Sequence, residues 1–325
     1  MISRRSLLAL LSSHALLACG GAAPPPVTPA DSGGADDGAA DAPPPPPPDA
    51  DVRAVAATGA QIEGRLEVAR LRSHPLAPQL MAQAVTETRV LVGTGIEPLE
   101  DIDRVFFAAK SARDPERVMV VVEHHVPADR RDEVMAALVA QGEEGSKALE
   151  GEPYPAVQVR YEGKQSLVLA VSPTVLVVTS PALREAARSL KDVSGLPAIE
   201  GEEALRVAID QPKQTLDNPR AEVPIPGSIS KADATLTFRD DGDADLHVEG
   251  QSTDAARAEE DAAQLTKTID EKTSVKAGPV RVRVVEPVVF GAQGDRVVAD
   301  RQITLKEMKT LLALGGALNA KRAAE

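Results

Sequence analysis

The stretch 157–179, VQVRYEGKQSLVLAVSPTVLVVT, decides the fold because it holds three short apolar runs separated by two turn signals. The runs are rich in Val and Leu and have the length of strands. Glu162-Gly163 separates the first two runs, and Ser172-Pro173 separates the last two. Connections this short join antiparallel neighbours. The stretch therefore predicts a three-stranded meander, with strands at 157–161, 167–171 and 175–179.

Strands and helices alternate on both sides of this meander. Period-2 alternation and short apolar runs predict strands at 62–68, 105–109, 118–124, 234–238, 245–249, 280–290 and 296–302. Helical spacing predicts helices at 128–141, 181–191, 254–272 and 304–320, and one that Ser73 caps with Pro75 in its first turn. This order predicts an α+β fold, with mainly antiparallel sheets covered by helices on one face.

The predicted elements fall into two halves, 53–210 and 228–325, on either side of a proline-rich connection at 211–227. The stretch from Val120 parallels the stretch from Asp245, since each reads as strand, short turn and amphipathic helix. The stretch from Val177 parallels that from Val297 in the same way. The alignment needs gaps, so we keep both readings open, duplicated halves and independent ones.

The first 18 residues have the parts of an export signal. Arg4 and Arg5 supply the positive start, and an apolar run at 7–18 leads to Cys19, the only cysteine. A membrane-spanning helix needs about 20 apolar residues, whereas a run of this length is typical of a cleaved signal peptide. Leu16-Leu17-Ala18-Cys19 resembles the lipobox of bacterial lipoprotein precursors.

This resemblance implies that the signal is cut before Cys19, which then carries acyl chains such as palmitate and anchors the protein to a membrane. Gly20 in place of Asp implies sorting to the outer membrane, so we expect a lipid-anchored cell-envelope protein facing the periplasm. Residues 3–8, SRRSLL, also resemble a twin-arginine export motif, which leaves the export route open.

Residues 19–52 form a predicted linker after the lipid anchor. Ala, Pro, Gly and Asp dominate it, and its segment 20–51 has six Asp and no basic residue. Such a composition buries too little apolar surface to fold, so we expect a disordered spacer. Pro43–Pro48 predicts a polyproline II rod of about 19 Å within it.

The composition excludes several classes of partner. After removal of residues 1–18 the chain has 34 Lys plus Arg against 49 Asp plus Glu, an acidic balance that repels phosphate backbones. With two Tyr, four Phe and no Trp, it also lacks stacking platforms for bases or sugars. We therefore expect no nucleic-acid binding.

Two clusters could be taken for metal sites. His124 and His125 are neighbours at a predicted strand, so they point to opposite faces. A site would also need a third ligand from elsewhere, and the sequence does not place the possible ligands His74 and His247. Asp241, Asp243 and Asp245 imitate the start of a calcium loop. The match then fails, because Leu246 replaces the required Gly and Ser252 the required Glu. We predict no metal and an Asp-rich hairpin turn.

No catalytic motif is present either. Gly93-Thr94-Gly95 follows an apolar run as a dinucleotide loop does, but Pro98 occupies the position of the third glycine. There is no nucleophile elbow, Walker loop or zinc-protease motif. The sequence therefore predicts no catalytic or cofactor-binding residue, no cofactor and no enzyme activity.

Residues 55–310 resemble a loosely defined group of uncharacterised lipoproteins from high-GC Gram-negative bacteria, through RLEVARLRSHPLAPQL from Arg65 and GIEPLEDIDRVFFAA from Gly95. We expect a non-enzymatic structural or protein-interaction role, with another envelope protein as a partner. The alternative is a periplasmic carrier or sensor of lipid or other apolar ligands. An apolar helix face such as Leu305, Met308, Leu311 and Leu312 suits a ligand cavity as well as a dry core.

Overall fold

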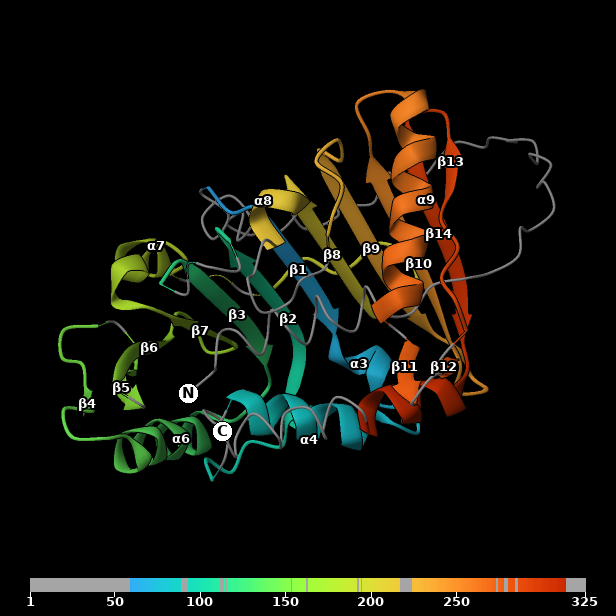
Figure 1. The fold of residues 1–325 in the computed structure, drawn as a ribbon. Helices are drawn as coiled ribbons and strands as arrows, with labels where there is room; N and C mark the ends of the chain where they lie inside the picture. Colours follow the sequence, from blue (N-terminus) through green and yellow to red (C-terminus); the bar gives the residue numbers. More distant parts are fainter. Residues whose placement is uncertain are drawn as a thin grey trace, which may run out of the picture.

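The computed structural model is built on one antiparallel sheet of twelve strands and a separate two-stranded hairpin (Figure 1). It describes residues 59–313 except 89–92, 112–113, 115, 153, 162, 192, 194, 217–223, 273, 278–279 and 284–285. In sheet order the strands are β13 (Gly291–Gln293), β14 (Arg296–Ile303), β10 (Ala244–Gln251), β9 (Lys231–Phe238), β8 (Leu205–Asp210), β1 (Ile62–Glu67), β2 (Ile102–Ala109), β3 (Val118–His124), β7 (Val175–Thr179), β6 (Lys164–Ala170), β5 (Ala156–Tyr161) and β4 (Lys147–Ala148). The protein is thus a mixed fold of helices and strands with a large antiparallel sheet.

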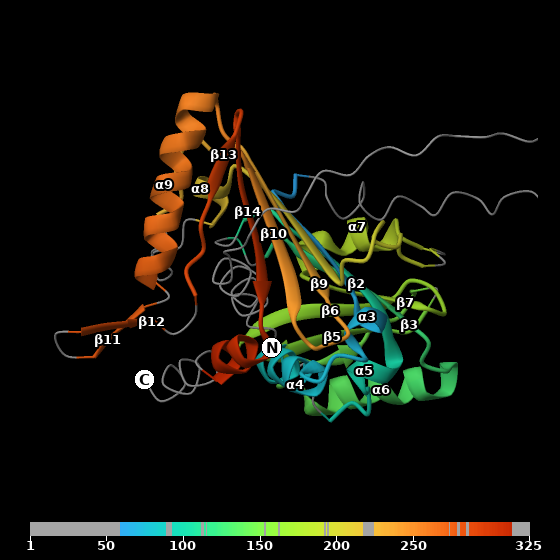
Figure 2. The same cartoon turned by 90° about the vertical axis from the view of Figure 1, so that its right-hand side faces the viewer.

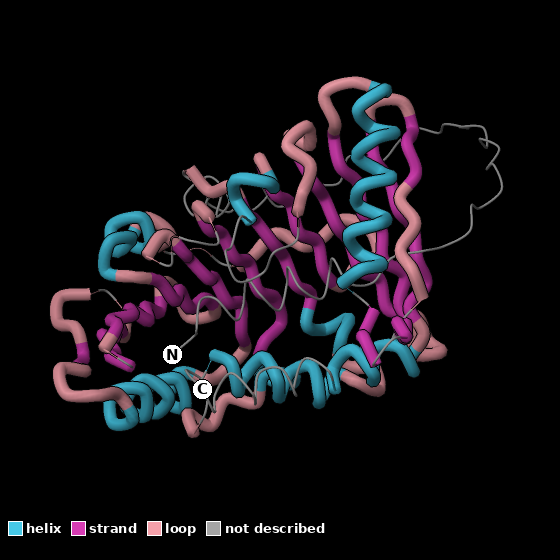
Figure 3. The backbone as a smooth tube through the Cα atoms, viewed as in Figure 1, coloured by secondary structure: helices cyan, strands magenta, loops and turns pink. Residues whose placement is uncertain are grey.

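The helices of the described residues lie against parts of this sheet. They are α3 (Val68–Leu71), α4 (Ala77–Thr88), α5 (Pro98–Asp101), α6 (Ala128–Gln141), the 3₁₀ turn η1 (Pro181–Leu183), α7 (Arg184–Arg188), α8 (Pro212–Leu216), α9 (Ala255–Lys272) and a helix at 305–313. Figure 3 shows α4, α6 and the last helix along one end of the strands, with α9 lying along the strands near β13 and β14. None of these helices combines the length and the apolar character needed to cross a bilayer.

One face of the sheet is apolar across nearly its whole width. Residues directly opposite each other on paired strands lie on the same face, so the register can be followed from strand to strand. One row runs from β6 to β10 through Ala170, Leu176, Val122, Val105, Leu66, Leu205, Leu236 and Leu246. We call this the apolar face. Both α6 and α9 pack on it, since their buried residues cluster with residues of this face.

The opposite face differs between the two halves. Next to β2 and β3 it is also apolar, and Phe106 and Met119 cluster there with Ala187 and Leu190 from the α7 region. In β9 and β10 the same face carries polar side chains such as Asp233 and His247, as alternation along a strand with one wetted face requires.

The centre of the apolar face depends on a glycine. Gly64 of β1 lies opposite both Phe107 of β2 and Val207 of β8. A Cβ on Gly64 would overlap the Phe107 ring, which occupies the space left by the missing side chain. Phe107 is 2% exposed. Any larger residue at position 64 would displace this ring and overpack the core.

The last helix is fastened to β14 by a buried ion pair. Arg301 stands on the apolar face opposite Leu246, and its guanidinium bonds to the Glu307 carboxylate and donates to the Glu286 carbonyl at 2.7 Å. Glu307 also accepts from the Thr304 backbone N–H at 3.0 Å, while the Thr304 hydroxyl accepts from the Glu307 N–H at 3.2 Å. This is a capping box, so one carboxylate both starts the helix and neutralises a buried arginine.

The two halves repeat one strand order. In the second half β9 and β10 form a hairpin, α9 follows, and β13 and β14 return so that β14 pairs with β10. In the first half β2 and β3 form a hairpin, α6 follows, and β6 and β7 return so that β7 pairs with β3. The two sets run outward in opposite directions from the central β8–β1 pair.

Several predicted elements need correction. The chain forms a strand at 205–210, which the sequence analysis missed, and it is this strand that joins the halves by pairing with β1 and β9. Among the described residues of the predicted strand at 280–290, those of β12 (Val280–Arg283) form a strand and 286–290 do not. β12 forms a hairpin with β11 (Ser274–Ala277) that projects from the end of α9 (Figure 2). Pro287 has no N–H for a ladder, and the Glu286 N–H is taken by Glu307.

The helices also differ from the prediction in two respects. They lie on both faces of the sheet rather than one, because α7 packs against the face opposite to α6 and α9. The helix predicted at 181–191 is a 3₁₀ turn followed by the five residues of α7. By contrast, the prediction of a helix at 128–141 is confirmed by α6. The helix predicted to reach residue 320 is described only to 313.

Candidate apolar site

A partly open apolar cavity of about 70 Å³ lies on the apolar face between the central strands, α8 and α9. Aliphatic side chains form almost all of its wall, and the contribution of polar atoms is negligible. Its floor comes from β1, β8, β9, β10 and β14, and its roof from Leu265 of α9 and from Phe290. Leu216 of α8 and Ile229 form one side.

Small residues on neighbouring strands create the hollow. Ala234 lies between Val207 and Val248, directly opposite both. One step along, Ala232 lies opposite Gly250, so two adjacent strands contribute one methyl group between them. Bulky side chains surround this patch and hold α9 away from it, which leaves space that no described residue fills.

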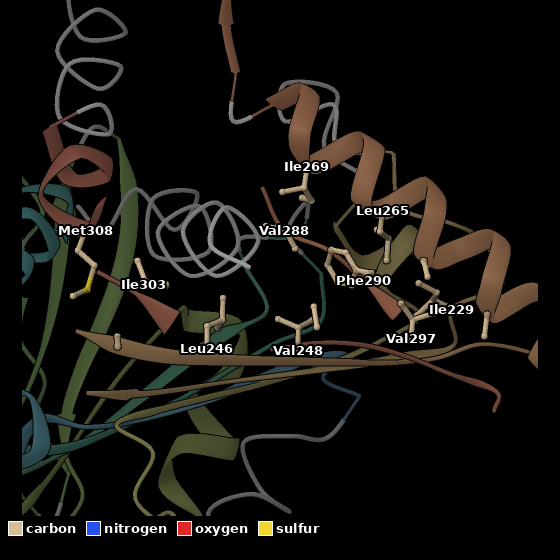
Figure 4. Close-up of a cluster of buried hydrophobic side chains, with 14 of the residues drawn as sticks. Ile229, Leu246, Val248, Leu265, Ile269, Val288, Phe290, Val297, Ile303 and Met308 are labelled. Atoms are coloured by element: carbon tan, nitrogen blue, oxygen red, sulfur yellow. The ribbon is translucent and has the colours of Figure 1, made fainter. Parts of the chain in front are cut away.

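Two kinds of contact hold α9 over the cavity: the packing of its apolar side chains against the sheet, and hydrogen bonds to the carboxylate of Asp261. Figure 4 shows Leu265 and Ile269 pointing from α9 toward the sheet, with Phe290 between the helix and the strands. Asp261, 4% exposed, accepts hydrogen bonds from the hydroxyls of Ser228, at 2.6 and 2.7 Å, and Ser252, at 2.6 Å. These bonds tie α9 to the segments before β9 and after β10, so the roof is fixed to the floor.

The α8 wall depends on a strained turn. Gln211 has φ of +50°, a left-handed conformation that costs a non-glycine residue roughly 1–2 kcal/mol. Its carbonyl accepts from the N–H of Gln214 and Thr215, at 2.9 and 3.0 Å. The turn redirects the chain from β8 into α8, so that Pro212 and Leu216 line the cavity.

The size and polarity of the cavity define what it can hold. Sites for whole drug-sized molecules enclose about 300–1,000 Å³, well above the volume here. Empty apolar cavities stay dry, because a water would find no hydrogen-bond partner. The site therefore suits the end of one aliphatic chain, with the remainder of the molecule outside.

The histidine pair is divided between the two sides of its strand end, as the alternation predicted. His124 is 2% exposed, and its Nδ1 accepts from the Val126 N–H at 3.1 Å. Burial, followed by the nearby positive charge of Arg131, lowers the pKa of His124 to about 4. His125 is exposed instead and contacts Asp103 at 3.0 Å. The pair serves packing and a surface ion pair, not one shared ligand.

The other candidate residues have structural partners of their own. His74 is buried, with Nε2 2.9 Å from the Gly242 carbonyl and its ring against Phe238. His247 contacts Asp300 at 2.6 Å. Asp243 accepts from the Leu305 N–H at 2.8 Å, and Asp245 pairs with Arg239 at 3.5 Å. Within the described residues, no three His, Cys, Asp or Glu side chains stand close enough together to hold a metal ion.

Three further features singled out from the sequence are the glycine loop at 93–95, the apolar face of the last helix and the N-terminal segment with Cys19. Gly93 and Gly95 take positive φ beside Thr94, and Pro98 begins α5, so this loop leads into a single helical turn. The apolar face of the last helix, which the sequence left open between core and ligand cavity, is core, because Leu305, Met308, Leu311 and Leu312 join the cluster under α9. Cys19, the signal at 1–18 and the linker at 19–52 lie outside the described residues.

No protein-family model matches the chain, and no curated protein matches it. Among solved structures, crystal forms I and III of TP0453 are similar to it. Each has 14% sequence identity and a TM-score of 0.47, covering 80% of this chain and 96% of the TP0453 chain. Likeness at that level carries no argument about what this protein does.

Filling the cavity should stabilise the protein. Ala234→Val adds two carbons to the floor of the hollow, and cavity filling of this kind raises stability by about 0.5–1 kcal/mol. Ala208→Val is the matched control, because it makes the same change on β8 with the side chain on the opposite face. Urea unfolding measures both. A loss of more than about 1 kcal/mol for Ala234→Val would mean that the space is already filled.

The pKa of His124 predicts acid sensitivity. Between pH 6.5 and 4 the unfolded chain binds a proton that the folded chain does not, so the free energy of unfolding falls as the pH drops through this range. The loss from this group amounts to about 3 kcal/mol. His124→Asn, whose side-chain oxygen can accept from the Val126 N–H, should lose less stability between pH 7 and pH 4.5, as measured by urea unfolding.

His247→Asn serves as the control for that experiment. It makes the same substitution at a partly exposed histidine, which contacts Asp300 and not the Val126 N–H. It keeps the buried His124, so the loss of stability between pH 6.5 and pH 4 should remain. An identical pH dependence in His124→Asn and the wild type would show that the buried imidazole does not cause the loss.

Proposed function

We propose that this chain is a lipid-anchored protein of the cell envelope whose folded part binds one aliphatic segment of an apolar ligand. The observation that carries the proposal is the cavity under α9, with its almost wholly apolar wall. A dry apolar hollow costs a folded protein stability through lost contacts, and a ligand's hydrocarbon would restore them. Each methylene that leaves water contributes about 0.8 kcal/mol.

The anchor part of the proposal rests on the sequence around Cys19. The lipobox resemblance implies acyl chains on this residue and a location at the membrane surface, in the periplasm. Ile62, the first residue of β1, lines the cavity and lies close to the start of the described residues. A spacer of the predicted composition would keep the cavity near the bilayer, where lipids and their breakdown products are concentrated.

We also propose that the two halves arose by duplication. The shared order of hairpin, helix and returning hairpin supports this, as does the position of α6 and α9 on the same face. The mirrored order about the β8–β1 pair is what an approximate two-fold axis perpendicular to the sheet would produce. Binding on the apolar face near this axis would then use elements from both copies.

Native mass spectrometry tests the ligand. A chain of residues 20–325, expressed in its own bacterium without the signal and Cys19 to avoid the attached lipid, should carry the added mass of one apolar molecule on part of the population. Ala234→Val in the same background should carry less, because it reduces the cavity. Only the mass of the bare polypeptide, in repeated mild preparations, would contradict binding and favour the structural or protein-interaction role that the sequence also predicts.

Metabolic labelling with an alkyne fatty acid tests the anchor. The wild type should take up the label, and Cys19→Ser should not, because it lacks both the acylated sulfur and the residue before which the signal is cut. The variant should also leave the membrane fraction or retain its signal, since anchoring by two or more chains is lost. Equal labelling of both proteins would end the lipoprotein interpretation.

A further inference from the structure

A lysine stands at the rim of the apolar cavity. Pro212 and Leu216, one position before and three after Lys213 on α8, both line the cavity, while Lys213 itself is exposed. A Cβ placed on Gly227 would come within 3.1 Å of the Lys213 Cδ and Nζ. The lysine side chain therefore extends from α8 to Gly227, which lies in the sequence between the lining residues Ile225 and Ile229.

This cation lacks a carboxylate partner among the described residues. Other basic side chains near the sheet are paired, for example Arg206 with Glu203 at 2.9 Å and Arg296 with Glu249 at 3.2 Å. Within the part of the chain that the structure describes, the Lys213 ammonium forms no ion pair. A cation at the mouth of an apolar hollow, with no ion-pair partner among the described residues, marks a place where an anion is favoured.

The cavity and the lysine together fit an amphiphilic ligand, which has an apolar chain and a charged head. The hollow can accept only hydrocarbon, because its wall offers almost no polar atom, and its volume holds only the end of a chain. The rest of the ligand must leave past the rim, where its headgroup meets water and the Lys213 ammonium. An unpaired negative charge would have a large desolvation cost inside the cavity, whereas at the rim it stays in water next to the Lys213 ammonium.

We propose that the cavity selects a single-chain fatty acid, with the hydrocarbon end under α9 and the carboxylate paired with Lys213. This assignment rests on the proposed function, since it names the class of ligand for the same site. The apolar contacts supply most of the affinity, and the ion pair supplies selectivity for an anionic headgroup. A solvent-exposed ion pair corresponds to a two- to fivefold change in affinity.

The test compares the binding of octanoate and 1-octanol, which have similar hydrocarbon chains and differ in the charge of the headgroup. A chain of residues 20–325, made without the signal and Cys19, is titrated with each, and the methyl NMR signals of Ile62, Ile209 and Ile229 report occupation of the cavity. We expect both to bind, with octanoate two- to fivefold tighter at low salt. That advantage should disappear at 1 M salt, which screens an exposed pair.

Lys213→Gln isolates the charge. It should weaken octanoate binding to the level of 1-octanol while leaving the dissociation constant of 1-octanol unchanged. Lys164→Gln, which removes an exposed lysine at the start of β6 in the other half of the sheet, should change neither. Circular dichroism confirms that each variant is folded.

The outcomes separate this inference from the proposed function. Equal affinity for the two ligands, or an unchanged octanoate affinity in Lys213→Gln, would overturn the fatty-acid assignment while leaving apolar binding in place. Failure of both ligands to shift the cavity methyl signals would overturn the assignment and the proposed function together.

Discussion

The pairing of β1 with β8 is the constraint on which the rest of this structure depends. Five residue pairs join these strands, from Ile62–Ile209 to Leu66–Leu205, and they connect two sets of strands that otherwise have separate hairpins and helices. Without this pair the sheet would end at two exposed edges, each inviting non-native pairing. With it, the outer edges are the short strands β4 and β13, which leave little backbone exposed.

The same pairing determines where the candidate site lies. It makes the apolar surfaces of the two halves continuous, and α6 and α9 cover this face toward its two ends. Residues near the seam then have to be accommodated between the helices. Phe107 fills the space over Gly64, whereas the small residues Ala232 and Ala234, one strand beyond β8, leave space unfilled. The cavity is thus a consequence of side-chain size along rows that cross the sheet.

Local patterns in the sequence predicted most elements but not how they combine. The alternation in 62–68 and the helical periodicity in 128–141 are local patterns, which involve only residues close together in the sequence. The structure forms β1 and α6 at these positions. The alternation Leu205, Val207, Ile209 is also present, but it is too short to stand out between a Gly-Glu loop and a proline. The cavity could not be predicted, because Ala232 faces Gly250 only once the register of β9 and β10 is known. The separation of His124 from His125 followed from the strand period alone.

Xenon binding tests the central claim most directly. The claim is that a preformed apolar cavity lies on the face that the β1–β8 pair makes continuous. Xenon has no polar or shape requirement beyond a dry apolar space, and larger engineered cavities of this type bind it. A crystal of the protein held under xenon pressure should show one atom between Ala234, Val248 and Leu265. An unoccupied site under pressure, or an ordered water at that position, would contradict the account.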